Sequence, residues 1–466
     1  MEKELVKHNE VKLLKNSAEK KPEIKAYTRR WLIMFLFIYY ACINAIQWIE
    51  YSSITHIVVK YYNVSTLAVD WTSTIYMSLY PVLVIPASYI IDKKGLRTAG
   101  IIGCIGTLIG TSIKVFSIRN DLFSVVLLGQ SIVAASQLVI ICLPPKLAAI
   151  WFKASEVSTA CSLGVFGTQV GCAIGYILPP LIVQDGDVEQ IGSQLKILCW
   201  LLAGSMVPVT IVVLVYFPNE PPLPPSNAQA LLRLNKQEFD TSVFFKSIKK
   251  LFLNRGFVIH MVAYSINIAV FSAVGTLLNQ FILQFFEGDY ENAGWMGFVM
   301  VISGTVGSII FGILLDKTHK YKEITLFIYF CSALSIGFLM FTLKYRQKLM
   351  TYFSCALVGI FTNAYMPVGF ELAIELTFPS EECTTSGILL ASTQILGVVV
   401  TVAVGYLNQY FRAFWTLSTQ MVLLLLGTIV TAYIPNNLLR LEASKQTNFQ
   451  FLKRKESRGS GLLFVK

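Results

Sequence analysis

Residues 159–171, TACSLGVFGTQVG, are followed 225 positions later by a matching stretch, TTSGILLASTQILG, at residues 384–397. The alignment places Gln169 opposite Gln394, and each glutamine follows a threonine. Internal duplication within an apolar chain is typical of secondary transporters, whose two repeats hold the substrate between them near the middle of the membrane. The matched stretches therefore predict a membrane protein with two related halves.

Two further pairs of acidic residues keep nearly the same spacing. Glu156 aligns with Glu381, again 225 positions apart, and Asp92 in IIDKKGLR aligns with Asp316 in LLDKTHKYK, 224 positions apart. Because the pairs are spread over most of each half, we interpret the repeat as a duplicated six-helix unit.

The composition agrees with this interpretation. Hydrophobic residues make up 55% of the 466 residues and charged residues only 14%, whereas an average soluble domain has about 25% charged residues. Most of the apolar stretches exceed the roughly 20 residues that are needed to cross the hydrocarbon. They lie at residues 31–54, 69–91, 98–117, 123–145, 157–182, 196–217, 256–284, 293–315, 324–342, 349–376, 384–408 and 413–435. The sequence predicts an all-α membrane protein of twelve transmembrane helices in two pseudo-symmetric six-helix bundles.

The chain divides into five segments. We expect a disordered cytoplasmic tail at 1–30, six-helix bundles at 31–217 and 256–435, a cytoplasmic linker with an amphipathic helix at 218–255, and a cytoplasmic tail at 436–466. The linker begins with PNEPPLPPSNAQ, which favours an extended chain. The polar, charged start of the chain predicts no cleavable signal peptide.

Basic residues decide the predicted orientation. Thirty of the 38 Lys and Arg residues fall in segments on the same side as the N-terminus, and basic loops favour the cytoplasm. We therefore expect both termini to be cytoplasmic, and we attribute the net charge of +11 to topology and anionic lipid rather than to nucleic acid. The plasma membrane is the expected location, with internal membranes as the alternative. Asn63 begins a glycosylation sequon in the first outer loop, close to the membrane.

One face of the first span is polar. Asn44, Gln47, Trp48 and Tyr51 follow helical spacing, and lipid offers no partner to an amide, so we expect this face to point into the bundle. The indole ring of Trp48 could attract a cation to its face. The alternative is a packed tryptophan with amides that bond neighbouring helices.

The duplication makes Gln169 and Gln394 pseudo-symmetric partners. Glutamine offers one acceptor oxygen and two N–H donors, which suits a hydroxyl or an amine without burying a charge. A single membrane glutamine most often bonds a neighbouring helix. A symmetric pair favours ligand binding across a central cavity.

Acidic residues in the spans allow two interpretations. Glu371 and Glu375 lie one turn apart in span ten, which is compatible with proton coupling or with attraction of a cation. The alternative places them near the cytoplasmic end, paired with a basic loop residue. Glu50 and Asp70 lie toward the outer ends of spans one and two, and we expect them to make the outer vestibule negative.

Other functions lack their motifs. The sequence has no GxxxxGK[ST] loop for ATP, and neither GxSxG nor HExxH for hydrolysis. Of the four histidines (His8, His56, His260 and His319), none lies clearly in mid-membrane, which disfavours haem ligation. We therefore predict no enzyme, no metal and no cofactor, and we expect the nine cysteines to be small buried hydrophobes.

Several stretches resemble the feline leukaemia virus subgroup C receptor-related family of the major facilitator superfamily. They are NAIQWIEYSSI, STLAVDWTSTIYM, WFKASEVSTACSLGVFGTQVGCAIGYILPP, GTLLNQ and GFELAIELTFPSEECTTSGILLASTQILG. The resemblance covers nearly all of residues 29–435 and does not extend to the tails or to the 218–250 linker. It implies a carrier of choline and ethanolamine, in a family formerly described as haem transporters.

Position by position, the resemblance also implies a substrate site. The cation-binding tryptophan of the family falls on Trp48, its two coordinating glutamines fall on Gln169 and Gln394, and an asparagine one turn before the tryptophan falls on Asn44. Met77 in span two is included in this predicted site.

Two positions depart from the family pattern. Ser272 stands where the family has a tyrosine in span seven, and Glu50 stands where it has a glutamine. Loss of one cation–π contact costs about 0.5–2 kcal/mol. We therefore expect weaker choline binding than in relatives, or preference for another amine, with Glu50 concentrating cations at the outer mouth.

The short link after span two resembles the loop motif of the superfamily, in which an aspartate holds one face closed. Asp92, Gly95 and Arg97 match the motif, and the second copy keeps Asp316. The resemblance therefore implies a gating role for Asp92, Arg97 and Asp316.

Taken together, we predict a monomeric twelve-helix transporter of choline, ethanolamine or a similar small organic cation. Its two bundles would alternate access to a central site by facilitated diffusion. The alternatives are a haem transporter, or a receptor or sensor that keeps the fold without transport.

Overall fold

The computed structural model describes residues 24–153, 156–225, 229, 249, 251–318, 320–377 and 382–435. The regular elements within these ranges are all helical. They are α2 (Arg29–Ile49), η1 (Ser52–Ile54), α3 (Thr55–Tyr62), α4 (Thr66–Val115), α5 (Phe123–Trp151), α6 (Val157–Ile182), α7 (Val188–Tyr216), α10 (Arg255–Leu283), α11 (Tyr290–Thr318), α12 (Tyr321–Lys344), α13 (Lys348–Thr377), α14 (Glu382–Tyr410) and α15 (Ala413–Ala432).

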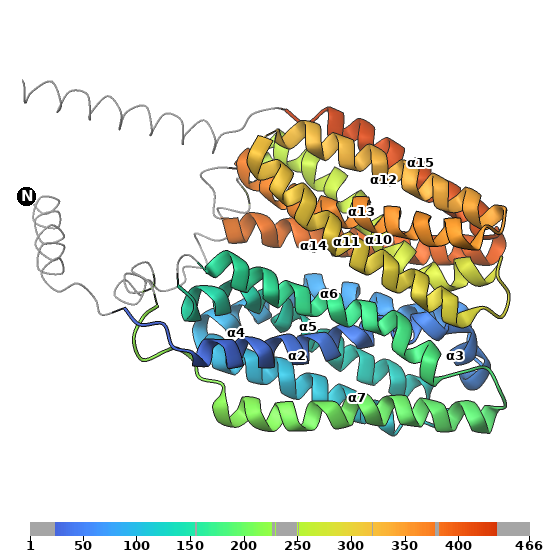
Figure 1. Ribbon diagram of the computed structural model, residues 1–466, viewed down its shortest axis with the longest axis horizontal. Coiled ribbons are helices and arrows are strands. Elements are labelled where there is room, and N and C mark those ends of the chain that lie inside the picture. Colours follow the sequence, from blue (N-terminus) through green and yellow to red (C-terminus); the bar gives the residue numbers. More distant parts are fainter. Residues whose placement is uncertain are drawn as a thin grey trace, which may run out of the picture.

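The helices form two bundles that lie one above the other in Figure 1. Helices α2 to α7 pack mainly on one another, and α10 to α15 do the same. Between the bundles, α6 contacts α11 and α4 contacts α14. We call the end of the molecule that carries residues 24–30 and 433–435 the terminus side, and the opposite end, with the loop 183–187, the far side.

Eleven helices of the described residues are long and apolar enough to cross a membrane. The first of these candidate spans, Arg29–Tyr62, includes the break after Ile49, where η1 and α3 follow. The remaining predicted span, residues 69–91, forms the first part of α4 and is helical, although the side chains of Ile85 and residues 88–90 lie outside the described set. The all-helical membrane fold that the hydropathy predicted is confirmed.

The link between the second and third spans turns at Gly95. This residue has φ 83° and ψ 179°, a non-helical conformation at the kink that divides α4 into two helices, and a side chain there would collide with Asn219. The Arg97 backbone N–H donates to Asn219 Oδ1 at 3.2 Å, and Arg97 Nη2 donates to the Leu214 carbonyl at 3.2 Å. Glycine is therefore required by both backbone conformation and space, as the predicted tight link demands.

Small residues let the first and fifth spans approach closely. A methyl group at Gly175 would lie 2.8 Å from the Ile46 carbonyl oxygen, and one at Gly171 would meet the Cys42 carbonyl oxygen. Close backbone contact through small residues is the usual way in which membrane helices associate. The packing fixes the level of α6 relative to α2, which positions the site described below.

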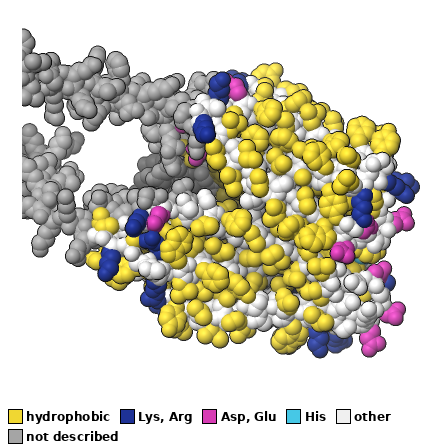
Figure 2. Space-filling model, viewed as in Figure 1, with side chains coloured by type: hydrophobic (Ala, Val, Ile, Leu, Met, Phe, Trp, Pro, Cys, Tyr) yellow, Lys and Arg dark blue, Asp and Glu magenta, His cyan; other side chains and the backbone are white. Residues whose placement is uncertain are grey.

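The surface carries hydrophobic side chains across its middle, whereas Lys, Arg, Asp and Glu gather toward the two ends (Figure 2). Exposed apolar residues such as Trp200, Ile309 and Leu349 lie on this surface. A protein in water rarely exposes apolar patches of such extent. The surface is therefore that of a protein surrounded by lipid.

Some predicted features lie outside the described residues. They include most of the two tails, most of the expected amphipathic helix in the linker, and the side chains of Asp92 and Asp316.

Candidate functional site

Polar bonds join the two bundles near the far side. Gln280 Nε2 of α10 donates to Asp70 Oδ1 of α4 at 2.6 Å, and Asn279 Nδ2 donates to the Ser53 carbonyl of η1 at 2.6 Å. A hydroxyl pair between Ser73 and Thr276, 3.3 Å apart, lies slightly further in. These contacts close the seam between the bundles on the far side.

Tyr176 of α6 closes the neighbouring part of the seam. Its hydroxyl donates to the Gly275 carbonyl of α10 at 2.7 Å. Its ring fills the space that a side chain at Gly297 of α11 would need, and a methyl group at Gly294 would lie 2.5 Å from the Tyr176 carbonyl oxygen. Without side chains at these glycines, α11 can lie directly against the tyrosine. Neither Tyr176 nor these glycines was among the predicted site residues.

An aromatic pair covers the same seam nearer to the surface. The ring of His56 in α3 stacks on that of Tyr290 in α11, with centroids 3.7 Å apart and planes 8° apart. The far-side seam is thus sealed by amides, hydroxyls and rings. The Ser73–Thr276, Tyr176–Gly275, Asn279–Ser53 and Gln280–Asp70 hydrogen bonds between the bundles all lie in this far-side half.

Gln169 and Gln394 both lie on helix faces that look toward the opposite bundle. Gln169 precedes Tyr176 by seven residues, so the two side chains share one face of α6. Gln394 precedes Gly405 by eleven residues, or three turns, and a methyl group at Gly405 would lie 3.3 Å from Asp70 Oδ2. Both glutamines are half-buried. The structure therefore places one glutamine on each bundle, on the terminus side of the seal.

Trp48 packs against two hydrophobic clusters. One contains Tyr76 and Val133 of the first bundle, and the other joins Ile49 and Tyr176 to buried residues of the second bundle. The indole Nε1 is buried and has no hydrogen-bond partner among the described residues. Because α2 and α6 run side by side, with Gly175 against Ile46 and Ile49, Trp48 lies near the level of Tyr176. An aromatic face with a free donor thus adjoins the inner edge of the seal.

Met77 and Ser272 lie at a similar depth. Gly397 of α14 lies one turn after Gln394, and a methyl group at Gly397 would be 3.0 Å from Met77 Sδ. Ser272 is 9% exposed and precedes Thr276 by one turn of α10, on the face that meets α4. Ser272, where the resemblance implies a tyrosine in the family, therefore faces the first bundle.

Asn44 is engaged within the first bundle. Its Nδ2 donates to Thr107 Oγ1 at 3.0 Å and to the Val133 carbonyl at 3.2 Å, and its Oδ1 is buried without a partner among the described residues. Gln47 and Tyr51 are buried as well. The polar face of the first span points into the protein, as expected, and the role of Asn44 toward a substrate stays a prediction.

The expectation that Glu50 enriches cations at the outer mouth is wrong. Glu50 is 1% exposed and forms an ion pair with Lys114, which is itself fully buried. Lys114 also donates to Gln130 Oε1 at 3.3 Å. The same Gln130 oxygen also accepts a hydrogen bond from the Tyr76 hydroxyl at 3.3 Å. The charge is neutralised inside the first bundle and does not face the vestibule.

The remaining predicted residues lie apart from this site. Glu371 is exposed and Glu375 is buried, and both are within the last two turns of α13. Arg97 holds the link at Gly95, as described above. Asn63 is exposed at the end of α3, with the left-handed φ of 51° that asparagine tolerates. The coupling, gating and glycosylation roles of these residues stay predictions.

Carboxylates of the far-side loops are paired within their own bundles. Lys60 donates to Asp185 at 2.6 Å, and this hydrogen bond lowers the pKa of Asp185. Partial burial works to raise the pKa of Asp289, but the bonds from Lys348 and Asn292 outweigh it and lower the pKa. Both groups are therefore ionised at neutral pH, and neither ties the two bundles together.

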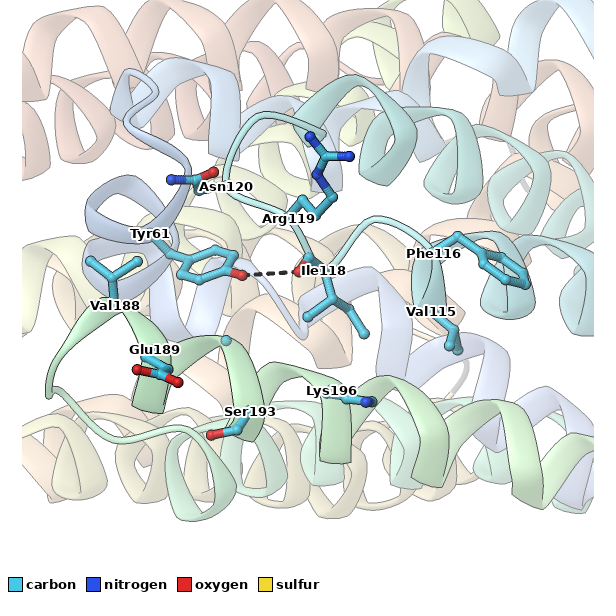
Figure 3. A pocket seen from close by; sticks show the side chains of 11 residues that line it. Tyr61, Val115, Phe116, Ile118, Arg119, Asn120, Val188, Glu189, Ser193 and Lys196 are labelled. Carbon is cyan, nitrogen blue, oxygen red and sulfur yellow. Dashed lines mark hydrogen bonds between the residues drawn. The ribbon is translucent and has the colours of Figure 1, made fainter.

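A pocket of about 690 Å³ opens on the far side of the first bundle (Figure 3). Tyr61 crosses it and donates its hydroxyl to the Ile118 carbonyl at 3.2 Å. Arg119, Glu189 and Lys196 also line it. None of the predicted substrate residues lines this pocket, which lies within one bundle and away from the seam.

Known proteins resemble this chain along most of its length. The sequence profile of the Major Facilitator Superfamily matches residues 32–382. An uncharacterized MFS-type transporter of Caenorhabditis elegans is 41% identical over 429 residues, which cover 91% of this chain and 72% of that protein. The choline/ethanolamine transporter flvcr2b of Danio rerio is 38% identical (91% and 87% covered), and human choline/ethanolamine transporter FLVCR2 is 36% identical (91% and 80% covered).

Solved structures show the same fold at low sequence identity. A bacterial homologue of the human lysosomal transporter Spinster matches with a TM-score of 0.68 and 13% identity over 89% of this chain and 99% of that one. A D-xylose–proton symporter matches with a TM-score of 0.68 and 12% identity, over 87% and 97%. The resemblance noted from the sequence motifs is thus confirmed, and the chain belongs to the major facilitator superfamily and, within it, to the family of the choline/ethanolamine transporters FLVCR1 and FLVCR2.

Proposed function

We propose that this transporter carries choline, ethanolamine or a similar small organic cation by facilitated diffusion. The names of its relatives favour this class of cargo. The observation that carries the proposal is the arrangement of Trp48, Gln169 and Gln394 on the inner side of the far-side seal. Trp48 would stack on the cationic head, and the glutamines would bond its hydroxyl or amine.

We further propose that the conformation is the inward-facing one. The seal lies on the far side, which is the outer side if the basic terminus side is cytoplasmic. Alternating access then requires the Asp70–Gln280 and Tyr176–Gly275 contacts to break while contacts on the terminus side form. Rocking of two repeats around a fixed central site is the usual mechanism of this architecture.

The same proposal includes the cellular setting. The protein would act as a monomer in the plasma membrane, or in an internal membrane, with both termini in the cytoplasm. Glu371 and Glu375 would serve proton coupling only if transport depends on a proton gradient. A gradient-independent flux would assign these two residues to the structure of α13.

Uptake of radiolabelled choline into cells that express this chain tests the proposal. We expect saturable uptake that is lost in Trp48→Ala and in Gln169→Ala at equal surface expression, with Trp200→Ala on the lipid-facing surface as the matched control. Flat uptake of both choline and ethanolamine by well-expressed protein would refute the cargo. Uptake that persists in both variants would refute the site.

Haem is the weaker candidate cargo. His260 Nε2 is 2.8 Å from the Gly369 carbonyl oxygen inside the second bundle, and His56 is stacked on Tyr290 in the seal. Neither described histidine is therefore presented to a porphyrin beside Trp48. Haem uptake that survives Trp48→Ala would favour this alternative.

A further inference from the structure

Asp70 stands apart among the buried acidic residues. Three acidic side chains of the described residues are buried, namely Glu50, Asp70 and Glu375. Glu50 is neutralised by Lys114. Asp70 is 5% exposed and accepts only one side-chain hydrogen bond, from Gln280 Nε2, while its Oδ2 is buried without a partner among the described residues. A neutral amide is a weak partner for a buried carboxylate, because it supplies no opposite charge.

The amide that meets Asp70 is held in place by a chain of other amides. Gln280 Oε1 accepts from Asn408 Nδ2 at 3.3 Å, and Asn408 Oδ1 accepts from Gln284 Nε2 at 3.0 Å. These bonds turn the N–H group of Gln280 toward Asp70. The second bundle therefore presents a prepared donor that reaches the carboxylate only when the far-side seam is closed.

Two further acceptors lie on this seam. Ser52 Oγ of η1 is buried and has no hydrogen-bond partner among the described residues, and Asn279 Oδ1 of α10 lies beside the His56 ring. Helix α10 contacts both η1 and α4. Opening of the far-side seam would thus expose a carboxylate together with further acceptors, which is an environment that attracts a cation.

The position of Asp70 separates it from the central site. Asp70 lies against Gly405, whereas Gln394 is eleven residues earlier on the same face of α14. At 1.5 Å per residue the separation along the helix is about 16 Å. A choline-sized cation cannot touch both positions at once.

We propose that Asp70 forms an outer recognition site for the ammonium group of the substrate. The site is open when the far-side seam is open, and closure of the seam exchanges the cation for the Gln280 amide, which releases the cation toward Trp48. The inference rests on the proposed function. It explains why a carboxylate lies at the seam and neutral groups lie at the centre. A carboxylate that loses access to the cation on closure aids capture without retaining the cargo.

Asp70→Asn tests this inference, because asparagine keeps an oxygen for the Gln280 amide and removes the charge. We expect the KM for choline influx to rise about five-fold, the upper end for one partly solvated ion pair, with the Vmax for influx retained. Inhibition of influx by 3,3-dimethylbutan-1-ol, an uncharged analogue of choline, should not weaken. Asp121→Asn, an exposed far-side carboxylate paired with Arg119, is the matched control and should behave as wild type.

A second variant protects the test against a folding defect. Gln280→Leu removes the competing amide and should lower the KM for influx while Vmax falls, which is the opposite change in KM from Asp70→Asn. Two results would overturn this inference and leave the proposed function standing. One is an unchanged influx KM in Asp70→Asn, and the other is an equal loss of apparent affinity for choline and for its uncharged analogue. Absence of saturable choline and ethanolamine uptake in wild type would instead refute the proposed function.

Discussion

Glu50 and Lys114 form a charge pair in the interior of the first bundle, with relative side-chain exposures of 2% and 1%. Such a pair contributes little net stability when it is complete, because desolvation of both ions offsets their attraction. Removing one partner leaves an uncompensated charge, which is far more costly. The pair also adjoins Gln130, whose Nε2 donates to the Gln47 carbonyl at 2.8 Å, so it supports the stretch of α2 that carries Trp48.

We predict that Glu50→Gln or Lys114→Met alone lowers the stability of the folded protein by about 3–5 kcal/mol. The double variant Glu50→Gln/Lys114→Met should recover most of this loss, since no lone charge remains. Thermal unfolding in detergent, followed by size-exclusion chromatography, measures the effect. Equal midpoints for the two single variants and wild type would contradict the buried pair.

The family resemblance predicts that Ser272 leaves the proposed substrate site with one aromatic side chain fewer than in the family. We predict that Ser272→Tyr lowers the inhibition constant for choline about 2- to 30-fold, the range of one cation–π contact. Ser272→Leu, which adds bulk without a ring, is the control and should bring no gain. Competition of choline against labelled ethanolamine measures the inhibition constant in both variants. A lower inhibition constant in Ser272→Leu would assign the effect to packing.

At the scale of elements, the contact between α6 and α11 acts as a closing surface. Tyr176 fits against α11 only because Gly294 and Gly297 lack side chains, and its hydroxyl then reaches the Gly275 carbonyl of α10. The same face of α6 carries Gln169. A single helix face thus combines a part of the seal with a part of the predicted substrate site.

We predict that Gly297→Leu prevents far-side closure and reduces choline uptake to a few per cent of wild type. Gly312→Leu on the same helix is the matched control, because no heavy atom lies within 4 Å of a methyl group built there. Alkylation of a cysteine placed at Ser73 reports on closure and should be faster in Gly297→Leu. Equal alkylation rates in the two glycine variants would contradict the closing role of this contact.

At the scale of the whole molecule, the proposed central site between the two bundles contains the neutral side chains Trp48, Gln169 and Gln394. A monovalent cation that crosses alone carries its charge through the membrane potential, which is worth about 2.3 kcal/mol per 100 mV. Facilitated diffusion of such a cation therefore needs no second gradient to accumulate cargo on the negative side.

We predict that choline accumulates in proteoliposomes about 50-fold at equilibrium for an inside-negative potential of roughly 100 mV. A potassium gradient with valinomycin sets the potential, and protein-free liposomes are the control. Accumulation that follows an imposed pH gradient at zero potential would contradict uniport and assign a coupling role to Glu371 or Glu375.

The sequence by itself determined the membrane class, the helical spans, the duplicated glutamines and the family. Hydrophobicity and repeat spacing are local properties of the chain, so they can be recognised without a partner in space. Only the tertiary structure decided where the polar groups of those spans find their partners. Glu50 meets Lys114 across 64 positions and Asp70 meets Gln280 across 210. In lipid each buried polar group must be satisfied by another part of the protein. The packing of the helices, which the pattern of residues does not specify, selects that partner and decides whether a charge faces the substrate path or the interior of a bundle.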